Sequence, residues 1–342
     1  MSVTLQQIAD LAGTTKSTVD KVIHDRPGVS KEKRQEIKNL LKEYGYEANP
    51  LAKALNYQKR KLKVAIILPA LTATPLIKSG MEAVRQDFLS FNIQVEYHEI
   101  AASDAVDQVR CIRKIADEKV SGAVILPIRS EIVKEAVKDL VRLDIPVVIV
   151  NSELDVDGIL YYVGQDMLRS GGLAARMLSL FSGGSANIGI ISCRNMIGHE
   201  QREQSFIKSV QDEHPGFHIV STRHIVETPE DAYDQTVEML TDNPEIDSVF
   251  ITCGCVEDIC RGIKDSKMAA RHDAQPVVIC YEKYDEIRAL ISNGEVACSL
   301  TGSLFRQGHL SMRILFEYLV YDRLPEEKAH YFGNKIMIRE NI

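Results

Sequence analysis

Apolar side chains in the first residues of the chain recur at the spacing of amphipathic helices. Thr4 stands three residues before Gln7, as in a capping box, and Gly13 is placed to end the helix that Thr4 begins. The apolar face of this helix consists of Leu5, Ile8, Ala9 and Ala12. Thr15 is the expected cap of a second helix over residues 16–23. Two short helices joined by a tight turn that contains glycine predict a helix-turn-helix.

The second helix separates polar from apolar positions. At about 100° per residue, its polar face consists of Lys16, Ser17, Asp20 and Lys21. Val19 and Val22 lie on the opposite side, where they are expected to pack on the first helix. Ser30 is the expected cap of a third helix, whose apolar positions are Ile37, Leu40, Leu41 and Tyr44. The pattern therefore predicts a small all-α unit with one polar helix face turned outward.

From residue 63 onward, short apolar runs alternate with helical patterns. The runs that suit buried parallel strands are Val64–Leu68, Gly122–Ile128, Pro146–Asn151, Asn187–Ser192, Ser248–Thr252 and Val277–Tyr281. The helical segments between them include Ile77–Phe91, Ala105–Lys119, Ser130–Leu143 and Ser170–Phe181. Alternating strands and helices predict an α/β fold, and about 280 residues suffice for two doubly wound lobes. Ligands of such folds bind beyond the carboxyl ends of the strands.

Composition narrows the class of protein. A length of 342 residues exceeds one core, and 45% hydrophobic with 26% charged residues exclude wholesale disorder. No apolar run approaches the roughly 18 residues of a membrane span, and no signal-peptide pattern opens the chain, so we expect a cytoplasmic protein with no membrane contact. Seven cysteines, an odd number, suggest reduced thiols. Cys253, Cys255 and Cys260 lack the spacing of paired metal ligands, so no metal or cofactor is expected.

The net charge of −7 is unevenly distributed along the chain. Residues 1–60 hold 11 basic and 7 acidic residues, a charge of +4, which leaves −11 for the remainder. A basic run, Lys59–Lys63, follows directly and suits a phosphate backbone. The change of sign predicts a domain boundary near residue 60, between a basic part that suits nucleic acid and an acidic part.

Several runs of the N-terminal segment form a recognisable pattern: Thr4–Gly13, Ser17-Thr18-Val19, Lys21-Val22-Ile23, Arg26–Ser30 and Tyr44-Gly45-Tyr46 followed by Asn49. They resemble the headpiece of LacI-type bacterial repressors, which implies a helix-turn-helix headpiece over 1–48, a hinge helix and linker over 49–62, and an effector-binding and dimerisation core over 63–342. The resemblance implies that the second helix enters the DNA major groove, where Lys16, Ser17 and Lys21 would read bases. Asp20 stands where the family usually has serine. It can accept from cytosine N4 or pair with Lys16, and either choice implies an altered operator preference.

Residues 49–55 resemble the family's hinge helix, which forms on DNA when two copies meet in the minor groove. Leu55 is then the wedge at the central base step, although it could also be an ordinary core residue. The full set of DNA-binding candidates is Thr4, Thr15, Lys16, Ser17, Thr18, Asp20, Lys21, His24, Ser30, Asn49, Ala52, Lys53 and Leu55. A hinge that needs a partner implies a homodimer on near-palindromic double-stranded DNA.

The remainder resembles, more weakly, the periplasmic-binding-protein-like effector core of the same family. The matching runs are Tyr162–Asp166, Ser170–Ala175, Arg202 ahead of Phe206, and Phe305–Gly308. The resemblance implies a ligand between two lobes and chain crossings near residues 162, 291 and 320. Lobe 1 would comprise 63–162 and 292–320, and lobe 2 would comprise 163–291 and 321–342. Candidate effector-binding residues are Thr72, Thr74, Arg129, Asn151, Arg194, Arg202, Gly254, Glu282 and Arg306.

The chemistry of the effector can also be addressed from the residues. The chain has no Trp, and the loop over 69–75 has no aromatic residue to cover a sugar face. Arg129, Arg194, Arg202 and His199 could together supply several cations, which favours an acidic or phosphorylated sugar derivative over a plain sugar. The alternative is that these arginines pair with carboxylates of surface helices.

Three classes of function compete. The leading one is a transcriptional regulator, expected to be a repressor, that a small molecule releases from its operator; a corepressor would give the same sequence signals. A solute-binding protein of a sugar transporter would carry a signal peptide and no headpiece. An enzyme is disfavoured because no catalytic motif for acyl, phosphoryl or hydride transfer is present.

Overall fold

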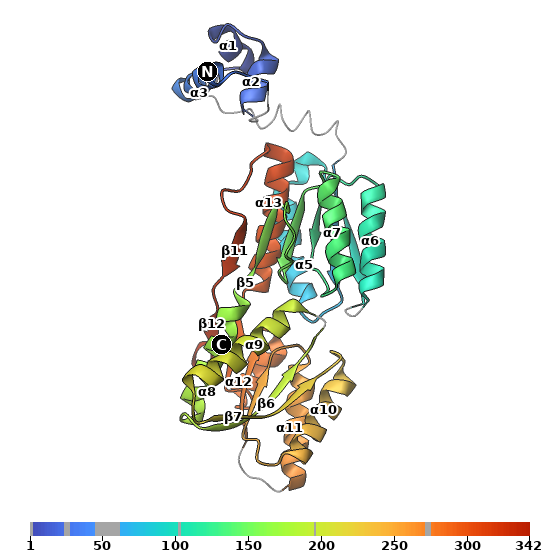
Figure 1. Ribbon diagram of the computed structural model, residues 1–342, viewed down its shortest axis with the longest axis vertical. Helices are drawn as coiled ribbons and strands as arrows, with labels where there is room; N and C mark the ends of the chain where they lie inside the picture. The colour runs from blue at the N-terminus through green and yellow to red at the C-terminus, as the bar shows by residue number, and fades with distance from the viewer. Residues whose placement is uncertain (1–2, 24–27, 45–61, 102–103, 195, 271–274) are drawn as a thin grey trace. The chain divides into compact units, whose positions relative to one another are not determined.

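The computed structural model describes residues 3–23, 28–44, 62–101, 104–194, 196–270 and 275–342 (Figure 1). The chain divides into two units. One contains Met1–Lys61 with two short segments, Ser90–Asn92 and Glu317–Leu324. The other contains Leu62–Leu89, Ile93–Phe316 and Pro325–Ile342.

Three helices form the described N-terminal part: α1 (Leu5–Leu11), α2 (Lys16–Ile23) and α3 (Lys31–Glu43). Their predicted caps are confirmed. Thr4 forms a capping box with Gln7, and the Thr15 hydroxyl accepts from the Thr18 amide at 3.2 Å. Ser30 does the same at the start of α3. The core of this unit consists of Ile8, Ala9, Ala12, Val19, Val22 and Ile37. Residues 49–55, the predicted hinge helix, lie outside the described residues.

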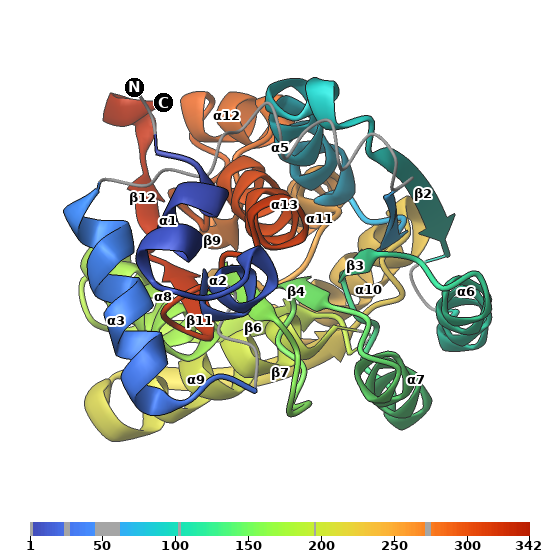
Figure 2. The same cartoon turned by 90° about the horizontal axis from the view of Figure 1, so that it is seen from above.

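The first six-stranded sheet is parallel throughout and has the order β11-β5-β4-β3-β1-β2. Its strands are β1 (Lys63–Pro69), β2 (Gln94–Ile100), β3 (Gly122–Ile125), β4 (Val147–Asn151), β5 (Tyr161–Gln165) and β11 (Ala329–Phe332). The helices of this lobe are α5 (Thr74–Asp87), α6 (Ala105–Asp117), α7 (Glu131–Arg142) and α13 (Leu304–Tyr321). Figure 2 shows α6 and α7 on one side of the sheet and α5 with α13 on the other. We call this sheet and its helices the first lobe.

The second sheet has the order β12-β10-β9-β8-β6-β7, and β12 alone among the described strands runs antiparallel to its neighbour. Its strands are β6 (Ala186–Ser192), β7 (Phe217–His224), β8 (Ser248–Ile251), β9 (Val277–Tyr281), β10 (Cys298–Thr301) and β12 (Lys335–Met337). Its helices are α8 (Met167–Ser182), α9 (Ile197–Glu213), α10 (Pro229–Asp242), α11 (Val256–Ala270) and α12 (Asp285–Ser292). We call this the second lobe. The predicted doubly wound α/β architecture is thus confirmed.

The predicted lobe limits need correction. β10 pairs with β9, so residues 298–301 belong to the second lobe and not to the first. β11 pairs with β5, which places residues 329–332 in the first lobe. The chain therefore passes between the lobes after Gln165, between Thr301 and Leu304, and between Phe332 and Lys335. The reason is that short strands near the C-terminal end complete both sheets, and such strands leave little periodic signal. No helix among the described residues combines the length and apolar character needed to cross a bilayer.

Candidate effector pocket and DNA-reading surface

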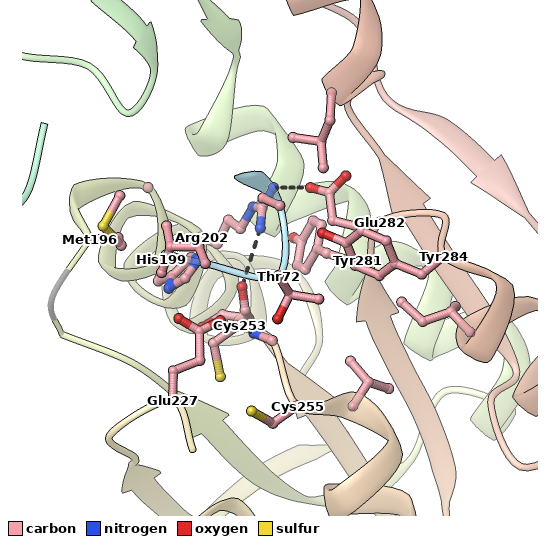
Figure 3. Close-up of a pocket in the computed structure, with 18 of the residues that line it drawn as sticks. Thr72, Met196, His199, Arg202, Glu227, Cys253, Cys255, Tyr281, Glu282 and Tyr284 are labelled. Carbon is pink, nitrogen blue, oxygen red and sulfur yellow. Dashed lines mark hydrogen bonds and ion pairs between the residues drawn. The ribbon is translucent and has the colours of Figure 1, made fainter. Parts of the chain in front are cut away.

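A cavity of about 350 Å³ lies where the carboxyl ends of the two sheets face each other (Figure 3). The first lobe contributes Thr72, in the loop after β1, and Asn151, the last residue of β4. The second lobe contributes the start of α9 and the loops after β7, β8 and β9. This is the place where doubly wound folds bind ligands, because parallel strands all end at the same edge of the sheet. Its volume suits a small molecule.

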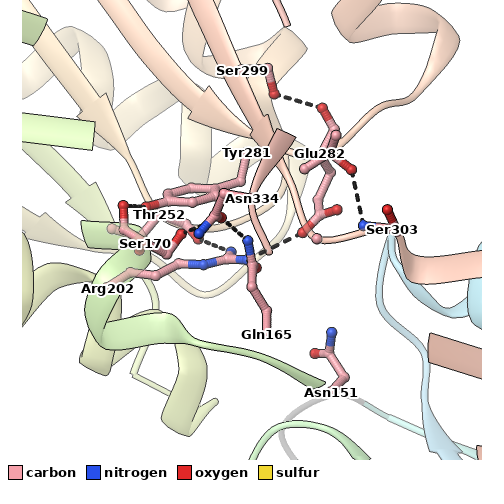
Figure 4. A network of polar contacts seen from close by, with 12 residues as sticks. Asn151, Gln165, Ser170, Arg202, Thr252, Tyr281, Glu282, Ser299, Ser303 and Asn334 are labelled. Carbon is pink, nitrogen blue, oxygen red and sulfur yellow. Dashed lines mark hydrogen bonds and ion pairs between the residues drawn. The ribbon is translucent and has the colours of Figure 1, made fainter. Parts of the chain in front are cut away.

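Arg202 is the central cation of the pocket and is only 3% exposed. Its guanidinium donates to the Thr252 carbonyl at 3.2 Å, to Gln165 Oε1 at 2.7 Å and to Glu282 Oε1 at 3.2 Å (Figure 4). The same group lies 3.8 Å from the ring centroid of Tyr281. α9 supplies Arg202, and the ends of β8 and β9 supply most of its partners. A guanidinium with this many contacts is fixed in orientation.

Glu282 directly follows β9 in a left-handed backbone conformation, with φ of 77°. Its amide donates to the Leu300 carbonyl at 2.9 Å, and its own carbonyl accepts from the Ser299 hydroxyl at 2.6 Å. Burial raises the pKa of the Glu282 carboxyl, and Arg202 opposes that shift. The second carboxylate oxygen, Oε2, is buried and has no hydrogen-bond partner within the described structure. Strained, non-glycine backbone at such a position is typical of ligand clamps.

Glu227 also lines the pocket and lies in the loop after β7 of the second lobe. Its Oε1 accepts from the Gly254 amide at 2.6 Å. Its Oε2 is buried and, among the described groups, has no hydrogen-bond partner. Burial raises the pKa of this carboxyl, whereas the Gly254 amide and Arg202 lower it. A Cβ on Gly254 would stand 2.3 Å from Glu227 Oε1, so this contact requires glycine.

His199 stands beside Glu227 in the pocket (Figure 3). Burial, helped by the charge of Arg202, lowers the pKa of His199 to about 3, so the ring is neutral. Within the described residues, Cys193, His199 and Glu227 are the one group of three whose ligand atoms approach within 4.8 Å of one another. A zinc ion at about 2.0–2.3 Å from each atom would require this group to contract.

Residues of the pocket contact the segments in which the chain crosses from one lobe to the other. Gln165, at the first crossing, binds both Arg202 and the Asn334 side chain of the third crossing. Gly302, at the second crossing, packs against the Gln165 amide so closely that a Cβ would lie 2.7 Å from it. Ser170 also donates to Asn334, at 3.0 Å. Hydrogen bonds therefore join the central arginine to the first and third crossings (Figure 4), and a close packing contact adds the second.

Five of the effector candidates line the cavity, namely Thr72, Asn151, Arg202, Gly254 and Glu282. The other four candidates do not. Thr74 is buried, and its hydroxyl donates to the Pro69 carbonyl at the start of α5. Arg129 forms a salt bridge with Glu200 at 3.0 Å, and Arg194 is exposed. Arg306 lies 4.9 Å from the ring centroid of Phe332, outside the cavity.

An acidic effector was predicted from four positively charged side chains, and these do not come together in the pocket. Arg202 is the one arginine that lines the described pocket, and His199 is neutral. Arg129 does not line the pocket, because a long arginine side chain after a strand can turn toward a neighbouring helix. Sequence reasoning missed Glu227, Tyr281, Tyr284, Cys253 and Cys255 as lining residues. Tyr281 and Cys253 stand at the ends of predicted strands, so the strand-end rule could have found them.

In the N-terminal unit, α2 presents its polar face as predicted. Lys16 and Ser17 are exposed, Thr18 and Lys21 are half-buried, and Val19 and Val22 are buried against α1. Thr4, Thr15 and Ser30 serve as helix caps. The remaining DNA-binding candidates fall outside what the structure describes: the side chain of Asp20 and the residues His24, Asn49, Ala52, Lys53 and Leu55.

Two protein families match the chain. Residues 64–322 match the periplasmic binding protein domain, and residues 4–49 match the bacterial regulatory proteins of the lacI family. Among curated proteins, the chain is 26% identical to the HTH-type transcriptional regulator RegA of Clostridium saccharobutylicum over 172 residues. That alignment covers 49% of this chain and 49% of RegA, so it spans about half of either protein. The sucrose operon repressor of Vibrio alginolyticus is 36% identical over 92 residues, which are 27% of this chain and 92% of that sequence.

Solved structures share the fold of the effector core. The glucose-galactose binding protein GanP of Geobacillus stearothermophilus superimposes with a TM-score of 0.74 at 17% identity, over 82% of this chain and 99% of GanP. A solute-binding protein of Burkholderia graminis in complex with D-arabinose gives a TM-score of 0.73 at 15% identity, over 82% and 96%. The chain therefore belongs to the lacI family of bacterial regulatory proteins, with a periplasmic binding protein domain as its larger part.

Proposed function

We propose that this protein is a sequence-specific DNA-binding transcriptional regulator, and specifically a repressor, whose operator affinity depends on a small molecule bound between its two lobes. The observation that carries the proposal is the helix-turn-helix of residues 4–23. Its second helix packs Val19 and Val22 inward and leaves Lys16 and Ser17 exposed, as base reading from the major groove requires. The names of the related regulators support the same function.

The effector pocket supports control by a small molecule. It lies between two lobes joined at three crossings, so a ligand that binds both walls favours the closed arrangement of the lobes. The carboxylates, the amide of Asn151 and the Thr72 hydroxyl offer directed hydrogen bonds of the kind that hold polyhydroxylated molecules. A homodimer on a near-palindromic operator, acting in the cytoplasm, completes the proposal.

A solute-binding protein of a sugar transporter is the alternative, because the core shares its fold with such proteins. The helix-turn-helix unit favours the regulator, since capture of a solute for a transporter has no use for a base-reading helix. An enzyme is the third interpretation. The related proteins are named as regulators and not as enzymes. That this protein catalyses no reaction remains a prediction.

The test is selection of DNA from a random library, followed by binding of the enriched sequence over a series of salt concentrations. We expect an enriched near-palindrome whose affinity falls steeply with salt. Replacing Lys16 with Ala should weaken that binding by about 10- to 100-fold. The control is Lys208→Ala on α9. This lysine is exposed and pairs with Asp212 at 2.7 Å, and its replacement should leave the affinity for DNA unchanged. Failure to enrich any sequence at low salt would refute the proposal.

A further inference from the structure

The pocket carries an excess of negative charge. Five carboxylates line it, from Glu227, Glu257, Asp258, Glu282 and Glu286, against the single guanidinium of Arg202. Asp258 has a partner outside the cavity, Arg261, at 3.2 Å. No lysine is among the described residues of the lining. Glu257 and Glu286 are exposed, so they contribute a negative potential that attracts cations toward the cavity.

The guanidinium is poorly placed to bind an anion. Its two terminal nitrogens already donate to Thr252, Gln165 and Glu282, and its face lies on the Tyr281 ring. Its Nε is buried without a hydrogen-bond partner among the described groups, but a single N–H cannot form the two parallel bonds that favour arginine for anions. A phosphate or carboxylate would have to displace Glu282 from Arg202. That exchange would leave a buried carboxylate unpaired, which is strongly unfavourable.

Among the described carboxylates of the lining, Glu227 is the one that has a buried, unpartnered oxygen and no salt bridge. Its Oε1 is bound by the Gly254 amide, and its Oε2 is buried without a hydrogen-bond partner among the described groups. The adjacent imidazole of His199 is neutral, and its Nδ1 is equally without a partner there. Buried carboxylates in proteins are nearly always paired or hydrogen-bonded. A neutral hydroxyl could donate to Oε2, but it would not balance the charge.

We propose that the effector is a small polyhydroxylated molecule that bears at least one positively charged amino group, and that this group pairs with Glu227 Oε2. The proposal rests on the proposed function and names the chemical class of its effector. The amino group donates to Glu227, the hydroxyls bond to Asn151, Thr72 and the free oxygen of Glu282, and anionic derivatives are rejected.

The experiment uses the full-length protein and sets of related ligands that differ in one substituent. Amino sugars and aminocyclitols (glucosamine, galactosamine, mannosamine and 2-deoxystreptamine) are compared with their N-acetylated, hydroxyl and phosphorylated counterparts by thermal shift and calorimetry. At least one free amine should bind about 10- to 100-fold more tightly than its N-acetylated counterpart, as expected for a charged rather than a neutral hydrogen bond. Equal or tighter binding of the N-acetylated, hydroxyl or phosphorylated member, or no binding of any amine, overturns the proposal.

Two variants locate the effect. Glu227→Gln keeps an oxygen for the Gly254 amide but removes the charge, so the preference for the amine should disappear. Glu238→Gln, an exposed position of α10 outside the cavity, should keep it. A preference that survives Glu227→Gln would refute the assignment to Glu227. If Glu227→Gln fails to fold, the ligand series on the unaltered protein still decides.

The same preparation is tested for operator binding, which separates the two proposals. Operator binding that responds to a neutral or anionic sugar and not to any amine refutes the charge inference and leaves the regulator intact. Amine binding without sequence-specific DNA binding refutes the regulator and leaves the assignment of the pocket.

Discussion

His199 shows how strongly a single position in this pocket can affect the protein. The ring is neutral because burial penalises its charged form and the guanidinium of Arg202 adds repulsion. Its neighbour Glu227 is a carboxylate whose pKa burial shifts upward, so the pair is not a simple ion pair. The folded protein therefore resists protonation of this histidine, whereas the unfolded chain protonates it near pH 6.5.

This difference predicts a pH dependence of stability. The folded-state pKa of His199, about 3, lies below its unfolded value of 6.5, so the stabilising contribution is complete above pH 6.5 and is lost as the pH falls toward 3. Between about pH 6.5 and pH 5 the loss should amount to about 2 kcal/mol. His199→Gln should remove that part of the slope in urea unfolding curves. The raised pKa values of Glu227 and Glu282 act in the opposite direction, but they are present in both proteins.

The control for this measurement is His218→Gln, an exposed histidine on β7, which should follow the unaltered protein. Parallel slopes for His199→Gln and the unaltered protein would show that the histidine does not resist protonation.

Single residues of the site were predictable where a plain apolar run marks a strand and the residue stands at the carboxyl end of that strand. Asn151 ends, and Thr72, Gly254 and Glu282 follow, strands whose apolar runs are plain in the sequence, so their place at the pocket edge could be inferred. Glu227 could not be found in this way, because most positions of β7 are only partly buried and the strand has no apolar run. Arg129 follows a well-predicted strand and yet bonds to Glu200, because sequence position does not fix the direction of a long side chain.

At the scale of elements, α8 has two adjacent glycines, one packed tightly against α9 and one with open space beside it. A Cβ on Gly171 would lie 2.3 Å from the Arg202 carbonyl and 2.7 Å from the Phe206 amide nitrogen, both on α9. A Cβ on Gly172 would meet no atom closer than Ser209 Oγ at 4.0 Å. Gly171 therefore allows α8 and α9 to approach each other and sets the position of the helix that carries Arg202.

The two glycines provide a matched test of this packing. Gly171→Ala should destabilise the protein by about 1–3 kcal/mol or more, because the two helices must separate. The same change should weaken effector binding, because α9 carries Arg202. Gly172→Ala should stabilise by about 0.5–1 kcal/mol, since alanine favours a helix interior over glycine. Denaturant unfolding and ligand titration of both variants make the comparison; similar effects at the two positions would contradict it.

Burial explains only part of which strands were predictable, because β5 and β10 are buried at every position and were not predicted. The six strands found from the sequence are almost entirely buried, so each is a continuous apolar run. β2 and β7 are edge strands with mostly half-buried positions, and β11 and β12 are only 4 and 3 residues long. Their pairing is decided by neighbouring strands rather than by their own composition, so no local pattern could reveal it.

At the scale of the whole molecule, a salt bridge connects the two lobes. Arg129 follows β3 of the first lobe, and Glu200 lies on α9 of the second lobe, 3.0 Å away. Both side chains are partly exposed, so the pair contributes at most about 1 kcal/mol. Within the proposed function, that contribution favours the closed arrangement that holds an effector.

Breaking this salt bridge should therefore weaken effector binding without touching the ligand. Arg129→Gln is expected to reduce effector affinity by about two- to fivefold, and high salt should abolish the difference. Lys134→Gln, which removes a bond to Asp155 at 3.1 Å within the first lobe, is the matched control and should leave affinity unchanged. Equal loss in both variants, measured by calorimetry over a salt series, would refute a role in closure.

The order in which the sheets acquire their strands has a consequence for synthesis on the ribosome. β11 and β12, residues 329–337, add the last edges to sheets whose central strands are translated far earlier. At about 5–20 residues per second, helices α1 to α3 emerge roughly 15–60 s before those edges exist. Once each has been synthesised, β5 and later β10 are open edge strands until β11 and β12 follow, a state prone to pairing with other chains. Translation that stalls before residue 329 would thus yield a core whose two sheets each lack an edge strand and are exposed to aggregation.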